Sequence, residues 1–217
     1  GRSSRTTEIY VSPGNDGIGE TFDCVALNGF EEICSFCKNK NIDLVFIGPE
    51  QPIAEGLSDY LRQHSIRVFG PSQAAGAIEY SKAFAKRIMT KYQVPTAIYR
   101  IIRNRAEAED ILKSFKMPVV LKADGLAAGK GVIIAHDLAE AYEACNTLLR
   151  QDCGQDGVLA EEYLEGWEVS LFAICDGDNY RTTLFSQDHK QLHDGDLGPN
   201  TGGMGAYCPV SEAQEYR

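Results

Sequence analysis

The sequence predicts an α/β fold in two parts, in which a parallel-sheet domain at the N-terminus is followed by a second, smaller α/β lobe. Two observations support this prediction. Short Val, Ile and Leu runs alternate with helical patterns along the 217 residues, and 21 glycines indicate several crowded turns. Because 43% of the residues are hydrophobic, the chain is long enough to bury one large core or two small ones.

The first part has a strand–helix–strand rhythm. The run DLVFI, for example, is typical of a parallel strand that is buried on both faces. The expected elements, in order, are strand 8–12, helix 31–40, strand 43–47, helix 53–64 and strand 66–69.

Glycine turns follow three of these strands, at Gly14, Gly48 and Gly70. In a Rossmann-like parallel sheet, ligands bind beyond the carboxyl ends of the strands, so these turns are expected to face a common crevice. The alternative for each turn is that the glycine only ends the strand and that no ligand binds there.

The second lobe begins after a helix that Ser72 caps and that runs through Met89 to the break at Val94 and Pro95. A hairpin follows the lobe, and from Gln187 onward the sequence is polar and rich in glycine. We therefore divide the chain into domains 1–97, 98–167 and 168–217. The expected elements are strand 98–102, helix 106–115, strands 119–123 and 131–135, helix 138–149, strand 158–163, and hairpin strands 168–175 and 180–186.

The net charge of −10 argues against a nucleic-acid partner, because the average surface would repel a long polyanion. Local phosphate binding stays open, since oriented backbone N–H groups bind phosphate whatever the global charge. No apolar run approaches the roughly 18 residues of a membrane span, and an odd number of cysteines, seven, favours a reducing compartment. We expect a cytoplasmic protein with no membrane partner.

Two residue pairs have spacings that redox or metal sites share. Cys34 and Cys37 form a C-x-x-C pair, but no second pair follows at metal spacing, so buried helix thiols are the favoured interpretation. His189 and His193 lack a third ligand nearby. We predict no metal ligand in this chain.

The segment 124–132, DGLAAGKGV, is expected to be a flexible flap over phosphates. It lies between two strand patterns, whereas a P-loop needs another spacing and a following helix. Its small residues let the backbone close over phosphates, and Lys130 adds positive charge. An ordinary glycine-rich hairpin is the alternative.

Three lysines lie within these helix and strand patterns, and a phosphate oxygen is a suitable partner for one of them, Lys122. Lys122 lies within the apolar strand pattern VVLKAD, where burial of an ammonium group is costly unless an anion meets it. Lys82 and Lys86 lie at i, i+4 on one helix face. Solvated surface lysines are the alternative in each case.

Two further segments are rich in polar groups. Carboxylates at 161, 162, 165 and 168 accompany a strand whose edge can bind adenine, while a carboxylate can take ribose hydroxyls. A charged surface strand is the alternative. The tail 186–207 is expected to be a substrate loop with many backbone donors, with a disordered loop as the alternative.

Seven motifs, in this order, resemble those of the glycinamide ribonucleotide synthetases, which are ATP-grasp enzymes. The resemblance extends from about Ile9 to Val210 and implies a Rossmann-like domain followed by an ATP-grasp domain, both incomplete. The motifs are IGPE (47–50), FGPS (69–72), SKAFAK (81–86), VLKADGLAAGKGV (120–132), EEYL (161–164), SQDHK (186–190) and GPNTGGMGAY (198–207).

The resemblance implies an ATP-dependent carboxylate–amine ligase of purine biosynthesis. ATP phosphorylates the carboxylate of glycine, and the amine of 5-phosphoribosylamine attacks the glycyl phosphate to give glycinamide ribonucleotide, ADP and phosphate. Such a reaction needs positioning and charge neutralisation more than a protein nucleophile, so we name no catalytic residue. The parent protein is either single-function or part of a multifunctional purine enzyme.

The resemblance also implies roles for individual residues. The ATP phosphates would contact Lys82, Lys122 and the flap residues Gly125, Leu126, Ala127, Ala128, Gly129, Lys130 and Gly131. Adenine would contact Glu161, Glu162, Tyr163 and Leu164, and ribose would contact Glu168. The phosphoribosylamine site would contain Gly14, Asn15, Pro49, Glu50, Asp188, His189, Lys190, Asp196, Pro199, Asn200, Thr201, Gly202, Gly203, Met204 and Gly205.

The chain departs from the family pattern at both ends. Before EIYVSPGN the family has another strand and a glycine-rich turn, where this chain has GRSSRTT, which we expect to be an unrelated leader. After Val210 the family continues, and its ligands for magnesium, with manganese as a substitute, would lie beyond Arg217. A different ATP-grasp ligase and a non-catalytic nucleotide sensor stay open as other hypotheses.

Overall fold

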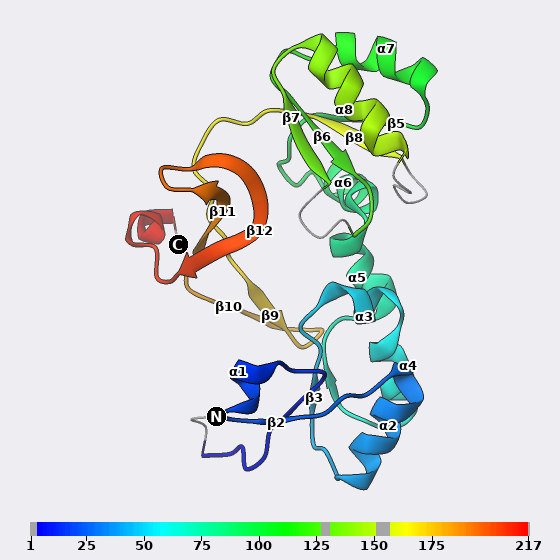
Figure 1. The fold of residues 1–217 in the computed structure, drawn as a ribbon, viewed down its shortest axis with the longest axis vertical. Coiled ribbons are helices and arrows are strands. Elements are labelled where there is room, and N and C mark those ends of the chain that lie inside the picture. Colours follow the sequence, from blue (N-terminus) through cyan, green and yellow to red (C-terminus); the bar gives the residue numbers. More distant parts are fainter. Residues whose placement is uncertain (1–3, 127–130, 151–156, 217) are drawn as a thin grey trace. The chain divides into compact units, whose positions relative to one another are not determined.

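The computed structural model describes residues 4–126, 131–150 and 157–216 (Figure 1). The chain divides into two compact units, one up to Ala77 and one from Ile78 onward. Both units mix helices and strands, which confirms the α/β prediction. Our functional division at residues 97 and 167 stays a prediction.

The first unit contains two pairs of parallel strands. In the second pair, Val45 and Phe46 of one strand lie opposite Val68 and Phe69 of the other, and the strands run parallel. This confirms the predicted strand–helix–strand unit. The core beneath them is formed by apolar side chains such as Leu61, which is fully buried. The elements are β1 (Tyr10–Val11), α1 (Asp16–Gly19), β2 (Asp23–Cys24), α2 (Gly29–Asn39), β3 (Val45–Phe46), α3 (Glu50–Ala54), α4 (Leu57–Gln63) and β4 (Val68–Phe69).

Two predicted helices are each divided in two. The helix expected over 53–64 is broken between α3 and α4 by Gly56, whose φ of 94° is a left-handed conformation that favours glycine. The helix expected after Ser72 is α5 (Gln73–Tyr80) and then α6 (Lys82–Lys91). Ser72 accepts a hydrogen bond from the amide of Ala75 (3.2 Å), as a capping residue does. Ser81 adopts an extended backbone and caps the second helix, which redirects the chain.

The second unit is built on a four-stranded antiparallel sheet with the strand order β5-β8-β6-β7. Two helices, α7 and α8, cover one face of this sheet (Figure 1). All six elements agree in type with the sequence prediction, and their ends differ from the predicted ones by at most two residues. They are β5 (Tyr99–Ile102), α7 (Arg105–Lys113), β6 (Val119–Ala123), β7 (Val132–Ala135), α8 (Leu138–Arg150) and β8 (Val158–Glu162).

Strand β6 shows how this sheet separates an apolar face from a polar one. Val119, Leu121 and Ala123 are buried in the core under the helices. Because side chains alternate along a strand, Lys122 points to the opposite face. Full burial of a side chain such as Leu121 stabilises the fold by about 1.5–3 kcal/mol, so the core fixes which face Lys122 occupies.

The C-terminal segment forms two antiparallel hairpins and a short 3₁₀ helix. Asp176 accepts hydrogen bonds from the amides of Asp178 (3.1 Å) and Asn179 (2.8 Å), which stabilises the predicted turn of the first hairpin. The second hairpin contains the residues that we expected to form an irregular substrate loop. The elements are β9 (Ala173–Cys175), β10 (Tyr180–Thr182), β11 (Gln187–His193), β12 (Leu197–Tyr207) and η1 (Ser211–Tyr216).

The loop prediction for the tail is therefore wrong in its secondary structure. Strand β12 pairs with β11 from Tyr207 back to Leu197, with two register shifts along the pair. Gly198 and Gly203 have φ values of 87° and 123°, so glycine lets this strand deviate from regular geometry while it keeps its pairing. The glycines indicated irregular backbone, but not its pairing with another strand.

Cys34 and Cys37 are buried in α2, which confirms the interpretation of this pair as helix thiols. Burial raises the pKa of the Cys37 thiol, which makes it less reactive. Within residues 4–126, 131–150 and 157–216, no helix is both long and apolar enough to cross a membrane.

Candidate functional site

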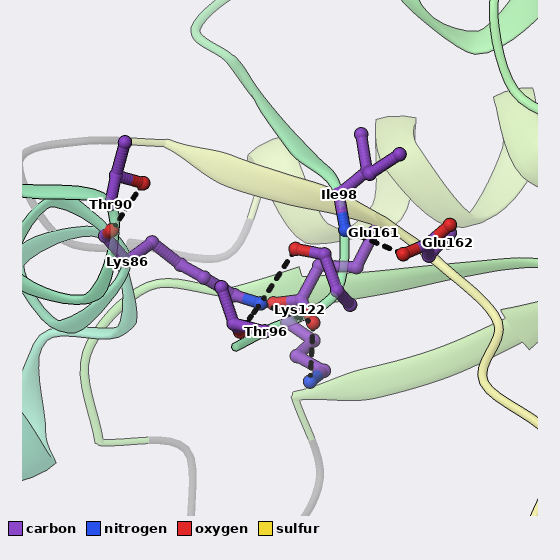
Figure 2. A network of polar contacts seen from close by, with 8 residues as sticks. Lys86, Thr90, Thr96, Ile98, Lys122, Glu161 and Glu162 are labelled. Atoms are coloured by element: carbon purple, nitrogen blue, oxygen red, sulfur yellow. Dashed lines mark hydrogen bonds and ion pairs between the residues drawn. The ribbon is translucent and has the colours of Figure 1, made fainter. Parts of the chain in front are cut away.

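Lys122, Lys86 and Glu161 form a cluster of charges on the sheet face opposite the helices (Figure 2). The Nζ atom of Lys122 donates to Oε2 of Glu161 at 2.9 Å, and Nζ of Lys86 lies 3.2 Å from the same oxygen. Lys122 comes from β6, Glu161 from β8 and Lys86 from α6. We call these three residues the charge cluster.

The register of the sheet explains how the charge cluster forms. Strands β6 and β8 are neighbours, and Val120 lies opposite Glu161 while Lys122 lies opposite Leu159. Lys122 and Glu161 are therefore diagonal neighbours on one face, within reach of each other's side chains. The Glu161 side chain is 5% exposed and that of Lys122 is 29% exposed, so solvent reaches the cluster from the lysine end.

Lys82 lies beside this cluster at the first position of α6. Its Nζ donates to the carbonyl oxygen of Gly125 at 2.8 Å, which joins the helix to the start of the predicted flap. Partial burial lowers the pKa of Lys82, and the nearby Asp124 carboxylate opposes that shift. A ligand with negative charge would stabilise the ammonium form of this lysine.

Asp124 anchors α6 to the end of β6. Its Oδ1 accepts a hydrogen bond from the amide of Ala83 at 3.1 Å, and its Oδ2 accepts one from the Ser81 hydroxyl at 3.2 Å. The side chain is nearly buried, with 7% exposure. A carboxylate that accepts from a helix N-terminus is well stabilised, so Asp124 fixes Lys82 relative to the sheet.

The predicted flap does lie between antiparallel strands, because β6 pairs antiparallel with β7. Gly125 begins it with a φ of 85°, and Leu126 after it is exposed. At the other end, the carbonyl oxygen of Gly131 accepts from the amide of Ala123 at 2.7 Å. Ala127, Ala128, Gly129 and Lys130 lie outside the described residues.

The residues predicted to contact adenine and ribose lie at and after the end of β8. The Glu162 carboxylate accepts a hydrogen bond from the amide of Ile98 at 2.9 Å, so it joins β8 to the chain before β5 (Figure 2). Tyr163, Leu164 and Glu168 are exposed. A cavity of about 380 Å³ is lined in part by Glu162 and Tyr163.

In the first unit, Gly14 and Asn15 line a hollow of about 600 Å³ together with Cys24. A side chain at Gly14 would overlap with Cys24, and the φ of 75° also favours glycine, so this turn requires glycine. The Asn15 side chain accepts from the amide of Ile18 at 2.9 Å and caps α1. Pro49 precedes α3, and Glu50 is its exposed first residue.

On the β11–β12 hairpin, Asp188 and Lys190 form an ion pair with an N–O distance of 2.5 Å. The hydrogen bond from Lys190 lowers the pKa of Asp188 and raises that of Lys190 in turn. The His189 ring stacks on Tyr207 across the hairpin, with ring centres 5.9 Å apart. The motif SQDHK therefore presents one neutralised ion pair and one aromatic pair.

Strand β12 holds the remaining predicted substrate residues. Thr201 donates to the Lys190 carbonyl oxygen at 2.9 Å and accepts from the Gly203 amide at 3.0 Å. Among the described residues, no three His, Cys, Asp or Glu side chains gather where they could hold a metal ion. Asp196, with a φ of 56°, occupies the turn before the strand, and Pro199, Asn200, Gly202, Met204 and Gly205 lie along it.

Two polar residues of the second unit, Ser81 and Thr96, were given no role by the sequence prediction, and Asp124 was named only as the first residue of the flap segment. Ser81 and Asp124 join α6 to β6, and Thr96 receives a hydrogen bond from Lys86 at 2.7 Å. A signal for Ser81 was available, since serine is a typical N-cap residue, but the sequence analysis placed it inside one continuous helix. Asp124 and Thr96 had no such local signal, because their partners are distant in sequence.

Comparison with known families matches both units. Residues 80–216 match the model of the family described as "Phosphoribosylglycinamide synthetase, ATP-grasp (A) domain". Residues 1–79 match "Phosphoribosylglycinamide synthetase, N domain", a range that includes the seven residues that we expected to be an unrelated leader. The chain belongs to the phosphoribosylglycinamide synthetase family.

Relatives within the phosphoribosylglycinamide synthetase family support this assignment. The phosphoribosylamine–glycine ligase of Halalkalibacterium halodurans is 44% identical over 100% of this chain and 52% of its own length. The chloroplastic ligase of Arabidopsis thaliana is 43% identical, over 96% of this chain and 41% of its own length. The crystal structure of the Thermotoga maritima ligase matches with a TM-score of 0.76 and 33% identity, over 94% of this chain and 50% of that one. The chain thus spans about half the length of these relatives.

Proposed function

We propose that this chain supplies the ATP-binding part and part of the amine-binding residues of a phosphoribosylamine–glycine ligase. In the proposed reaction, ATP phosphorylates the carboxylate of glycine. The amine of 5-phosphoribosylamine then attacks the glycyl phosphate, and glycinamide ribonucleotide, ADP and phosphate are released. The reaction belongs to purine biosynthesis.

The main observation behind this proposal is that two lysines lie close to the start of the flap. Lys82 and Lys122 come from different elements, and each is partly buried beside the strand that leads into the flap. Partly buried ammonium groups with access to solvent are suited to neutralise phosphate charge. Acyl phosphate formation needs this positioning and neutralisation more than a protein nucleophile.

For the nucleotide, we propose that Lys82 and Lys122 bind the phosphates and that residues 125–131 cover them. The segment from Glu161 to Leu164 would bind adenine, and Glu168 would bind the ribose hydroxyls. A carboxylate can accept two hydroxyl donors, and a strand end offers both a backbone donor and an acceptor. Figure 2 shows that the Glu161 carboxylate contacts Lys86 and Lys122, so a contact with adenine would be made beside these two lysines.

For phosphoribosylamine, we propose contacts from the residues that the family pattern indicates in each unit. In the first unit these are Gly14, Asn15, Pro49 and Glu50. In the second they are Asp188, His189, Lys190 and Asp196, together with Pro199, Asn200, Thr201, Gly202, Gly203, Met204 and Gly205 on β12. Backbone amides beside glycine can approach a phosphate closely, and the Lys190 ammonium adds charge.

Magnesium, or manganese in its place, would neutralise phosphate charge when bound with ATP. We propose no metal ligand in this chain, because the family pattern that its motifs resemble places those ligands beyond Arg217. We expect the enzyme to act in the cytoplasm or, as in the plant relative, in a plastid. A multifunctional parent protein is a further proposal.

The test is phosphate release from ATP with glycine and freshly made phosphoribosylamine. We would use this chain joined to the C-terminal half that its relatives carry. Lys122→Met is expected to lower kcat/KM for ATP by about 100-fold or more, because one donor to the phosphates is lost. Lys91→Met, an exposed position on the same helix as Lys82, serves as the matched control.

Each result has a distinct meaning. Phosphate release that requires both glycine and phosphoribosylamine supports the ligase. Release with another amine or carboxylate instead would assign the chain to a different ATP-grasp ligase. Binding of ATP without any release in the joined protein would favour a nucleotide sensor and would refute the catalytic proposal.

A further inference from the structure

Lys86 is a buried lysine to which the proposed function gives no role. It lies one helical turn beyond Lys82 on α6 and is 7% exposed. Burial of an ammonium group is costly unless its donors and its charge are all satisfied. The partners of Lys86 therefore show what this position requires.

The Lys86 ammonium is held from several sides. It donates to the Thr96 hydroxyl at 2.7 Å and to the Ala97 carbonyl oxygen at 3.3 Å. It also lies 3.2 Å from Oε2 of Glu161 and 5.6 Å from the centre of the Tyr99 ring. An ammonium has three N–H donors, and these three oxygens can use all of them. Lys86 is thus fixed within the protein and has no donor left for a ligand.

The charges of the cluster do not cancel. Lys86 and Lys122 each carry +1 and Glu161 carries −1, so the sum is +1. Both ammonium groups contact the same carboxylate oxygen, Oε2. The Lys86 side chain is 8% exposed and that of Lys122 is 29% exposed, so the surplus positive charge is accessible at Lys122.

We propose that Lys86 is a positioning residue for nucleotide binding. It neutralises and fixes Glu161, and so lets Lys122 exchange this carboxylate for a phosphate oxygen of ATP. Without Lys86, departure of Lys122 would leave the Glu161 carboxylate buried and without an ionic partner, which costs free energy. With Lys86 in place, Glu161 keeps one ammonium partner throughout. This inference rests on the proposed function, in which Lys122 binds a phosphate.

The first experiment measures ATP affinity by calorimetry in the chain joined to its C-terminal half. Lys86→Met is expected to weaken ATP binding by about 10-fold or more, since Lys122 stays with Glu161. Lys91→Met is the control and should bind ATP like the wild type. If the wild type does not bind ATP, the proposed function fails. If the wild type binds and Lys86→Met binds equally well, only the role of Lys86 fails.

A double-mutant cycle separates this role from a general loss of structure. In a Glu161→Gln protein there is no carboxylate charge to neutralise, so adding Lys86→Met should change ATP affinity by no more than about 2-fold. A merely structural lysine would instead cost the same factor in both backgrounds. That result would overturn the proposal.

A measurement on the wild type keeps the proposal testable if the variants do not fold. With ¹⁵N-labelled lysine, ATP should shift the Nζ resonance of Lys122 and leave that of Lys86 nearly unchanged. A large shift of the Lys86 resonance, with Lys122 unaffected, would show that the two lysines have the opposite roles.

Discussion

Lys122 on β6 and Lys190 on β11 each pair with a carboxylate, but the two pairs have very different surroundings. The partner of Lys122, Glu161, has a side chain that is 5% exposed, and a second buried lysine contacts it. The partner of Lys190, Asp188, is 25% exposed, and Lys190 itself is 42% exposed. Both pairs belong to motifs that the family resemblance singled out, so the motifs alone did not show that one pair is buried and the other exposed.

This difference in burial changes what each pair can do. Exposed ion pairs contribute little to stability, because water and salt screen them. Buried charges are strongly coupled to one another, since water cannot replace a lost partner. The charge cluster is therefore a preorganised part of the fold, whereas the hairpin pair can separate at low cost when a ligand arrives. Three substitutions or titrations test this comparison.

The largest expected effect is on the buried side. Glu161→Ala leaves two lysines without their common carboxylate and is expected to lower the unfolding free energy of the second unit by about 3–5 kcal/mol. Hydrogen exchange of the β6 and β8 amides measures this unit by itself. Glu109→Ala removes an exposed carboxylate that pairs with Lys113 on α7, and exchange should stay unchanged. Equal effects of the two substitutions would remove the distinction that we draw.

A smaller effect is expected from Gly198→Ala on the hairpin. The residue has a φ of 87°, and an added side chain would lie 2.7 Å from the His193 ring. We expect a cost of about 1–2 kcal/mol from the left-handed conformation, confined to amides of β11 and β12. Gly202→Ala, where a side chain meets open space and φ is ordinary, is the matched control. Loss of protection in β6 as well would mean that the hairpin and the sheet unfold together.

The smallest effect is the pH dependence of the Asp188–Lys190 pair. The pKa of Asp188 is lowered in the folded protein, first by its hydrogen bond from Lys190. The pair's contribution to stability is therefore full above the unfolded pKa of about 3.9 and is lost as the pH falls through the folded pKa. Carboxylate NMR titration should show the pKa of Asp188 rising toward its ordinary value in Lys190→Met. An unchanged pKa in that variant would mean that backbone amides, not Lys190, hold the carboxylate ionised.

Much of the second unit follows from the sequence because its signals are local. The strand pattern VVLKA and the helical spacing of residues 138–149 each lie within one element, and both elements form where expected. The position of the flap between two strands also excluded a P-loop, and the antiparallel pairing of β6 with β7 agrees with it. Periodicity is read within about ten residues, so it needs no knowledge of distant partners.

The tertiary structure decided which of these elements meet. Lys122 and Glu161 are 39 residues apart, and only the register of β6 against β8 makes them neighbours. Lys86 looked equivalent to Lys82 as part of a basic helix face, yet docking of α6 buries Lys86 and leaves Lys82 at the flap. The sequence by itself determined the elements, the motifs and the family. Burial and partners depend on contacts between distant segments, and these exist only once the chain has folded.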